Sequence, residues 1–283
     1  MPVTSMGMAY KVWLESHIVF RACVLIIRGL KVTKSPLVIG IAKCDNQKST
    51  FDAALNEHLN IIDAAHQLGV QYLVFPFNSL TDDSNSLCLN KDAPFFDEIA
   101  AAAGHMAVSL GFREQITYDE KADMFQGFGN LPAENYAVLP IRTKRFSVSS
   151  QVIIRNGNVV HLQRYLTELP VSAVEQFGKI EQHANVSGWA LQSLIGEDFL
   201  NPAYVHIAAN RRPDLMIVSV ENQCQIALAS ALDMTEKNYG MSVVVVGEDF
   251  SMHTELETES GKLTVVPVTT KRQANQSRVA IAV

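Results

Sequence analysis

The sequence contains few of the residues from which disulfide frameworks and metal sites are built. Four cysteines are scattered over 283 residues without a Cys-x-x-Cys pair: Cys23, Cys44, Cys88 and Cys224. No histidine has another three or four residues away, the spacing that places two zinc ligands on one helical face. The sequence therefore predicts no disulfide framework, no metal and no cofactor, in a protein of the reducing cytoplasm.

Basic residues are also scarce. The chain has 23 Lys and Arg against 29 Asp and Glu, which gives a formal net charge of −6 and a pI near 5.8. A nucleic-acid backbone is bound by clustered Lys and Arg that displace its counterions. The composition therefore predicts no nucleic-acid partner.

Residues 1–36 depart from this acidic balance, because their only acidic residue is Glu15 while five are Lys or Arg. The apolar stretch 17–30 is interrupted by Arg21 and Arg28, so it is too short and too charged for a transmembrane helix or a secretory signal. Two interpretations stay open: an accessory segment that extends the domain, and an amphipathic segment for membrane contact or targeting. We expect a basic N-terminal extension over 1–36 and one domain over 37–283.

From residue 37 onward, apolar patterns alternate between strands and helices. Helical spacing predicts helices over 51–68, 94–104, 202–210 and 223–238, the first capped by Ser49 or Thr50 and ended by Gly69. Asn156-Gly157 is a strong hairpin signal. Strands are predicted over 37–42, 71–76, 106–110, 136–139, 148–154, 158–162, 189–195, 214–219, 242–246, 253–257 and 263–268. Helices between some strands and hairpins between others predict mixed sheets.

Three segments have a recognisable order and spacing: VFPFNSLT at 74–81, QRYLTELP at 163–170 and LIGED at 194–198. They resemble the three active-site segments of the nitrilase or carbon-nitrogen hydrolase family. The resemblance extends over 37–283 and implies an α/β (α+β) fold, a four-layer α-β-β-α sandwich with mixed sheets, assembled as a homodimer or larger oligomer. Active members hydrolyse amides or nitriles through a thioester.

The resemblance also shows what is missing from the site. Where the family carries its catalytic Glu, Lys and Cys, this chain has Phe77, Leu166 and Gly196. The family reaction needs a thiol nucleophile, a carboxylate that takes its proton and a cation that stabilises the developing charge. None of these three residues can do so, and a shift of one residue, to Tyr165, restores no lysine.

The sequence therefore predicts a catalytically inactive pseudoenzyme that binds a small molecule or a protein. Two arrangements of the degenerate site stay open. Phe77 and Leu166 can pack over the space left at Gly196 and fill the pocket, or all three can line an apolar pocket for a ligand that is not hydrolysed.

The alternative is a divergent amide or nitrile hydrolase with a relocated nucleophile. Cys224 follows a strand expected to neighbour the one that ends at Gly196, so Glu197, Asp198 or Glu221 could act as its base and Arg164 as its cation. The simpler interpretation makes Cys224 a buried apolar residue, with Glu197 and Asp198 capping the following turn.

Overall fold

The computed structural model describes residues 35–44, 50–81, 93–120, 142–221, 225–247, 251–253, 257–258 and 261–268. Cys224, the predicted strand at 136–139 and nearly all of the predicted N-terminal extension lie outside these residues.

The larger sheet has seven strands in the order β11-β12-β1-β2-β3-β4-β5. The central strands β12, β1, β2 and β3 pair in parallel, whereas β11, β4 and β5 join by antiparallel pairing. The strands are β1 (Leu37–Ala42), β2 (Tyr72–Val74), β3 (Ala107–Glu120), β4 (Arg142–Arg155), β5 (Asn158–Arg164), β11 (Glu257–Thr258) and β12 (Gly261–Val268).

The smaller sheet has five strands in the order β10-β9-β8-β7-β6. Its three central strands are parallel, and both outer strands are antiparallel to their neighbours. The strands are β6 (Ala184–Val186), β7 (Trp189–Ile195), β8 (Leu215–Ser219), β9 (Ser242–Val246) and β10 (Ser251–His253). The prediction of mixed sheets is confirmed in both.

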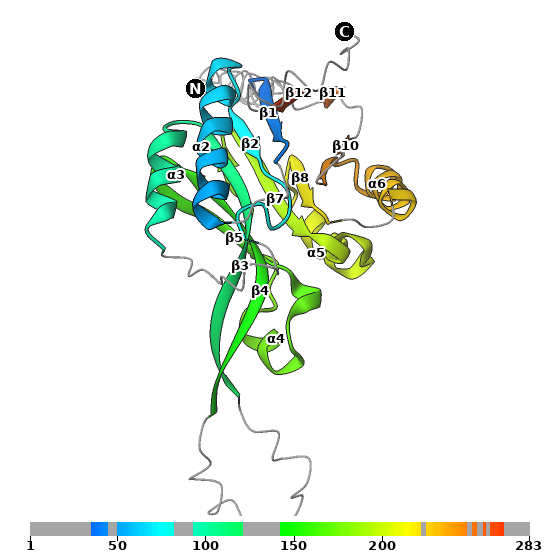
Figure 1. Ribbon diagram of the computed structural model, residues 1–283. Coiled ribbons are helices and arrows are strands. Elements are labelled where there is room, and N and C mark those ends of the chain that lie inside the picture. The colour runs from blue at the N-terminus through cyan, green and yellow to red at the C-terminus, as the bar shows by residue number, and fades with distance from the viewer. Residues whose placement is uncertain are drawn as a thin grey trace, which may run out of the picture.

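Helices cover the outer faces of the two sheets, with α2 (Phe51–Gln67) and α3 (Phe95–Ala103) on one side and α5 (Pro202–Asn210) and α6 (Gln225–Tyr239) on the other (Figure 1). The helix starts follow ordinary capping chemistry. The side chain of Thr50 accepts the N–H of Ala53 at the start of α2, and that of Asn201 accepts the N–H of Ala203 at the start of α5. A further short helix, α4 (Val171–Phe177), lies beside β3 and β4.

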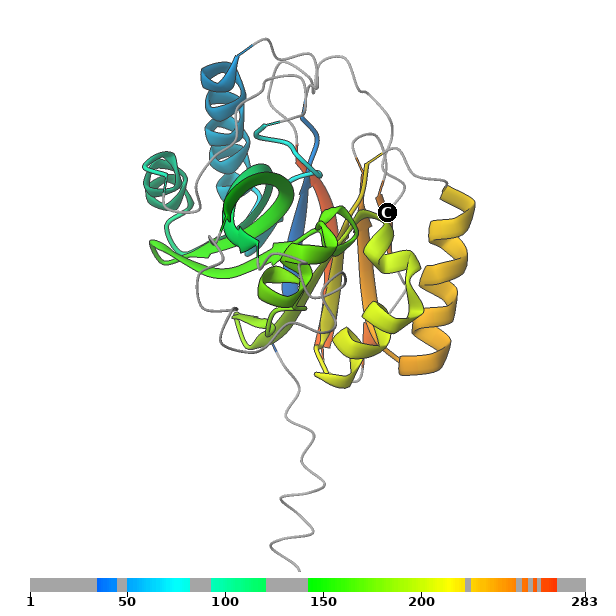
Figure 2. The ribbon, with the colours of Figure 1, turned by 90° about the horizontal axis from the view of Figure 1, so that it is seen from below.

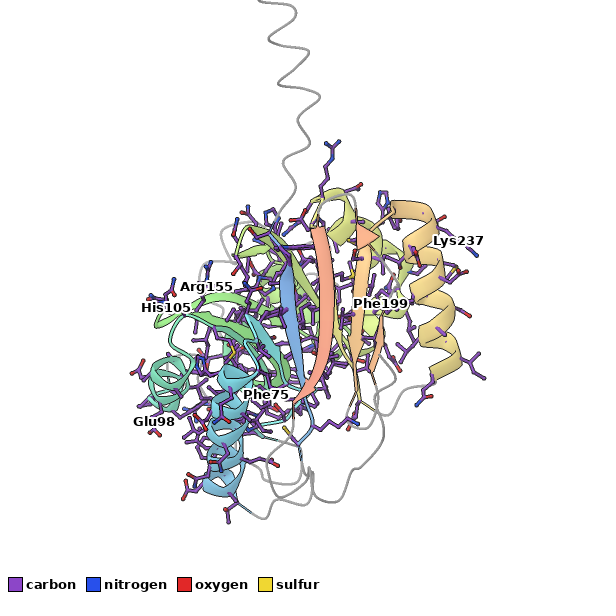
Figure 3. All side chains as sticks on the ribbon, turned by 90° about the horizontal axis from the view of Figure 1, so that it is seen from above. Phe75, Glu98, His105, Arg155, Phe199 and Lys237 are labelled. Carbon is purple, nitrogen blue, oxygen red and sulfur yellow. The ribbon has the colours of Figure 1, made fainter. Side chains whose placement is uncertain are left out.

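Three apolar clusters show that these elements form four layers. One lies between α2, α3 and the larger sheet, one between the two sheets, and one between the smaller sheet and α5 and α6 (Figure 2). Strand alternation explains the arrangement, because Leu37, Ile39 and Ile41 of β1 all contribute to the cluster between the sheets. Figure 3 shows Phe75 beside α2 and Phe199 on the α6 side. The architecture is the predicted α-β-β-α sandwich.

The structure differs from the sequence-based elements mainly in length. β3 and β4 are 14 residues each and project beyond the sheets as a hairpin arm, where polar residues alternate with apolar ones (Figure 1). The predicted strand at 253–257 corresponds to parts of two short strands, β10 and β11. The short α4 and β6 were not predicted, because 7 and 3 residues are too few to show a periodic pattern.

Candidate functional site

The structure brings together the three positions to which the resemblance assigns the family's catalytic residues. Phe77 follows β2, Leu166 begins the 3-10 helix η4 (Leu166–Glu168) after β5, and Gly196 begins the 3-10 helix η5 (Gly196–Leu200) after β7. Phe77 and Leu166 are only 8% and 4% exposed, and Gly196 is buried. Both side chains belong to the apolar cluster that continues beneath α5 and α6. These positions are therefore part of the hydrophobic core.

Tyr165 occupies the space above Gly196. Gly196 has a φ of +54°, a backbone conformation that favours glycine. A Cβ atom at this position would lie 2.7 Å from Cζ and 2.8 Å from Oη of Tyr165. These separations are far shorter than a van der Waals contact, so a cysteine cannot be accommodated at 196 unless the tyrosine ring moves.

The Tyr165 ring is held in place from two directions. Its hydroxyl oxygen accepts the backbone N–H of Glu197 at 3.1 Å, and its ring meets Phe77 edge-on with centroids 6.0 Å apart. Burial raises the pKa of Tyr165, so the phenol stays neutral. Tyr165 was not identified from the sequence as the residue that fills this space. The available signal was strand alternation, which places Tyr165 on the same face as the buried Gln163.

Asp198 joins two turns of the site. Its buried carboxylate accepts hydrogen bonds from the N–H groups of Leu166 and Thr167 at 2.7 and 3.0 Å, and from the Thr167 hydroxyl at 2.7 Å. Burial outweighs these bonds and raises its pKa to about 6. The side chain therefore caps η4, in a neighbouring segment, and not the turn after its own position that the sequence suggested. Glu197 is exposed.

A second polar group surrounds Glu168, at the end of η4. Arg113 forms an ion pair with Glu168 at 2.9 Å and donates to the Ser149 hydroxyl at 2.8 Å. Glu168 also accepts the backbone N–H of Ser149 at 2.7 Å. These contacts attach η4 to β3 and β4, and the sequence did not reveal them because no motif connects residues that lie so far apart in the chain.

The structure describes only some of the residues predicted for a relocated site. Arg164, its predicted cation, forms two 2.8 Å hydrogen bonds to Glu114, and its guanidinium lies 5.1 Å from the centre of the Phe177 ring. This arginine is therefore already paired with a carboxylate. The strands that precede Gly196 and Cys224 are parallel neighbours, as predicted, with Ile195 opposite Ser219. Cys224 itself lies outside the described residues.

A serine and a histidine lie in contact beside Phe77. The Ser79 hydroxyl is 3.0 Å from Nε2 of the buried His58, and Nδ1 of this ring lies 2.8 Å from the Ala54 carbonyl oxygen. A carbonyl can only accept, so Nδ1 carries the proton and Nε2 accepts from Ser79. The ring stacks on Phe75 with centroids 4.2 Å apart. This arrangement orients a hydroxyl toward a base.

Two hollows in the described part of the structure lie away from these positions. A cleft of about 90 Å³ lies among η5, α5 and α6, and an open hollow of about 610 Å³ lies along β5. Phe77, Leu166 and Gly196 line neither. Within the described residues, no three His, Cys, Asp or Glu side chains are arranged to hold a metal ion. No helix in the described part of the chain is long and apolar enough to span a membrane.

Solved structures of low sequence identity share this architecture. An amidase from Nesterenkonia sp. is 15% identical over 74% of each chain, with a TM-score of 0.50. A carbon-nitrogen hydrolase from Helicobacter pylori G27 is 11% identical over 74% of this chain and 72% of its own, with a TM-score of 0.50. A glutamine-dependent NAD+ synthetase from Acinetobacter baumannii, solved with ADP, is 15% identical over 76% of this chain and 39% of its own, with a TM-score of 0.51.

At these identities the likeness establishes the fold, so the chain has the fold of the nitrilase superfamily, as its sequence predicted. No protein-family model matches the chain, and no curated protein matches it in sequence.

Proposed function

We propose that this protein is a pseudoenzyme with the nitrilase-superfamily fold, which acts by binding and does not hydrolyse amides or nitriles. The observation that carries the proposal is the contact between Tyr165 and Gly196. An active member of the superfamily needs a thiol and a substrate carbon at this place. Here a buried tyrosine ring occupies the space in which a side chain at 196 would begin.

The chemistry of the neighbouring positions supports the same conclusion. Phe77 cannot accept a proton and Leu166 cannot stabilise an anion, so the base and the cation are lost together with the nucleophile. Loss of a nucleophile alone removes on the order of a millionfold of the rate in a serine protease. Because Tyr165 lies over Gly196 and meets Phe77 edge-on, we place ligand binding elsewhere on the surface and propose that the old pocket is filled.

We test the proposal by assaying the purified full-length chain with simple amides and nitriles, following ammonia release. We expect no turnover above the buffer rate. Turnover that scales with protein concentration and copurifies with the chain through two orthogonal columns would sink the proposal. Tyr165→Phe serves as the matched variant, because it keeps the ring that fills the space and is expected to be equally silent.

We further propose a cytoplasmic homodimer. Its interface is placed at α5 and α6, where Ile207, Met234 and Tyr239 are 45%, 54% and 39% exposed near the 90 Å³ cleft. Sedimentation velocity at several concentrations gives the mass. A Met234→Glu variant that sediments like the wild type would remove this placement, and a wild-type mass of one chain at micromolar concentration would remove the dimer.

The second candidate function is a divergent hydrolase with a relocated nucleophile, and the specific observation that favours it is the Ser79–His58 pair. In this scheme the Ser79 oxygen attacks an acyl carbon while its proton passes to His58 Nε2. The leaving group then takes that proton, and water releases the acyl group. Cys224 is the other candidate nucleophile.

Two reagents separate these possibilities. A fluorophosphonate that adds to Ser79, and no longer adds in Ser79→Ala, would favour the serine site. Turnover that is blocked by iodoacetamide and abolished by Cys224→Ala would favour the thiol. Under the pseudoenzyme proposal, neither substitution changes ammonia release and the fluorophosphonate leaves Ser79 unlabelled.

A further inference from the structure

Residues 1–34 join the fold at an edge where strands of both sheets begin. Ser35 is the first described residue, and its carbonyl oxygen accepts a hydrogen bond from the Trp189 indole N–H at 3.0 Å. Trp189 is the first residue of β7, and Ser35 lies two residues before the start of β1. The chain that precedes Ser35 therefore meets the folded body beside the starts of β1 and β7.

Three arginines lie at the same edge. The Arg155 guanidinium donates to the Asn185 carbonyl oxygen at 2.8 Å, and Asn185 pairs with Ala190 at the start of β7. Residues 211–212, both arginines, follow α5, and Asp214 just beyond them donates its N–H to the Ala190 carbonyl oxygen at 2.8 Å. All three arginines are therefore attached, directly or within a few residues, to the part of the fold that holds Ser35.

These arginines give the edge an excess of positive charge. None of the three forms an ion pair with another described residue. Arg212 is exposed, and Arg155 and Arg211 are partly exposed. Asp214, the carboxylate that follows them, accepts a backbone N–H at 2.6 Å, and Glu181 is held farther away, toward the end of β5. The edge is therefore locally basic, although the chain as a whole has a formal charge of −6.

The segment that joins this edge is itself basic and amphipathic in sequence. Residues 1–36 contain five Lys or Arg and a single Glu. At 3.6 residues per turn, Arg21, Arg28 and Lys31 fall within roughly 80° of one another on one face. Val19 and Ile26 fall on the opposite face. This pattern is typical of a segment that lies in a membrane interface, with its apolar face among the acyl chains and its basic face toward anionic head groups.

We propose that residues 1–34 and the arginine edge together bind the surface of an anionic lipid membrane without crossing it. This inference specifies the partner and rests on the proposed binding function. The apolar face of the segment would be buried in the interface, and Arg155, Arg211 and Arg212 would face lipid phosphates. Because the segment joins the fold at Ser35, the two basic regions meet the same surface.

A membrane fits this combination better than nucleic acid does. Both offer phosphates to the arginines, but only a membrane also has an apolar interior. The stretch 18–27 is apolar except for Arg21, so its burial needs such an interior. Nucleic-acid binding relies on clustered Lys and Arg and leaves an apolar stretch of this kind without a role.

The test is cosedimentation of the full-length protein with phosphatidylcholine vesicles that contain or lack phosphatidylglycerol. We expect saturable binding to the anionic vesicles alone, weakened by added salt. Arg212→Glu should weaken binding about tenfold, because it reverses a charge at the surface, and Arg21→Glu combined with Arg28→Glu should abolish it. Arg145→Glu is the matched control and should leave binding unchanged, because Arg145 is exposed and pairs with Thr117 on the projecting arm.

Tryptophan quenching reports insertion of the segment. The chain has two tryptophans, Trp13 in the segment and Trp189, which is 0% exposed. Brominated lipid in the anionic vesicles should quench the wild-type fluorescence, and it should leave the fluorescence of Trp13→Phe unquenched. Quenching that is equal in the two proteins would overturn the proposed insertion.

Three further results would overturn the proposal: no saturable binding to anionic vesicles, equal losses in Arg212→Glu and Arg145→Glu, or equal binding to neutral and anionic vesicles. Duplex DNA that displaces the protein from vesicles without any lipid quenching would overturn it in favour of a general polyanion site. Turnover of amides would instead contradict the pseudoenzyme proposal, so the two failures are distinguishable.

Discussion

The two ends of β5 differ in how far their side chains are exposed. Beyond its C-terminal end, Tyr165 and Leu166 are 8% and 4% exposed and pack into the core over Gly196. At its N-terminal end, Val159 and Val160 are more than 40% exposed beside an open hollow. The positions to which the resemblance assigns catalytic residues are closed by side chains, while the other end of the strand borders an open hollow lined in part by His161.

Polar contacts around the closed end hold its turns together independently of the apolar side chains at its centre. Asp198 attaches η5 to η4, and the Arg113–Glu168 pair attaches η4 to β3. The turns are therefore held by one set of side chains, while another set, which includes Phe77 and Leu166, forms the apolar centre.

The largest expected effect comes from the same change made at each end of β5. Leu166→Lys buries an unpaired ammonium group and should lower the free energy of unfolding by about 4 kcal/mol, whereas Val160→Lys should change it by less than about 0.5 kcal/mol. Urea unfolding at pH 7 measures both. Similar losses at the two positions would show that the edge of β5 is not open in solution.

A second test places a thiol at position 196, where the resemblance assigns the family's cysteine. Gly196→Cys should lower the free energy of unfolding by about 3 kcal/mol, because it adds contact with Tyr165 to backbone strain, whereas Gly69→Cys should lower it by about 1 kcal/mol from strain alone. Gly69 is a suitable control, since its φ is +69° and a Cβ there would meet no atom within 4 Å. Adding Tyr165→Ala to Gly196→Cys should bring the loss of unfolding free energy caused by the cysteine toward that of the control. Equal costs in the two glycine variants would remove the steric role of Tyr165.

The contributions of Asp198, at the closed end, and His161, at the open end, to stability should change with pH in opposite directions. The folded pKa of Asp198 is raised from 3.8 to about 6, so the folded state binds this proton more tightly and stability falls as pH rises through that window. The folded pKa of His161 is lowered from 6.5 to about 4, so stability rises over nearly the same window.

Relative to the wild type, Asp198→Asn should therefore gain about 2 kcal/mol of stability between pH 4 and 6, and His161→Asn should lose a similar amount over that range. Urea midpoints at half-unit pH intervals give both slopes. Parallel curves for the wild type and either variant would show that the residue does not titrate with the stated shift.

The smallest effects are expected for substitutions that break the ion pair between Arg164 and Glu114. Arg164→Met should cost about 2 kcal/mol, because it leaves Glu114, only 4% exposed, without its cation. Lys237→Met should cost less than about 0.5 kcal/mol, because the Lys237–Asp233 pair is exposed on α6 and Lys237 points outward (Figure 3). A loss at Arg164 no larger than at Lys237 would make the first pair a surface interaction.

The arrangement of layers followed from local patterns. Periodic apolar runs predicted β1, α2, β7, β8 and α6, because a long buried element must repeat its apolar residues at the period of its backbone. The order of strands and hairpins predicted mixed sheets for the same reason. Short elements such as β6 repeat too few residues to be visible in this way.

The sequence alone was enough to show that Phe77, Leu166 and Gly196 cannot serve as base, cation and nucleophile, because residue identity decides whether a group can attack, accept a proton or stabilise an anion. Tertiary structure decided that Tyr165 fills the space over Gly196, that Asp198 caps η4, and that His161 faces a hollow beside β5. These facts depend on distances between segments that approach each other only when the two sheets pack, and no local pattern in the chain encodes such distances.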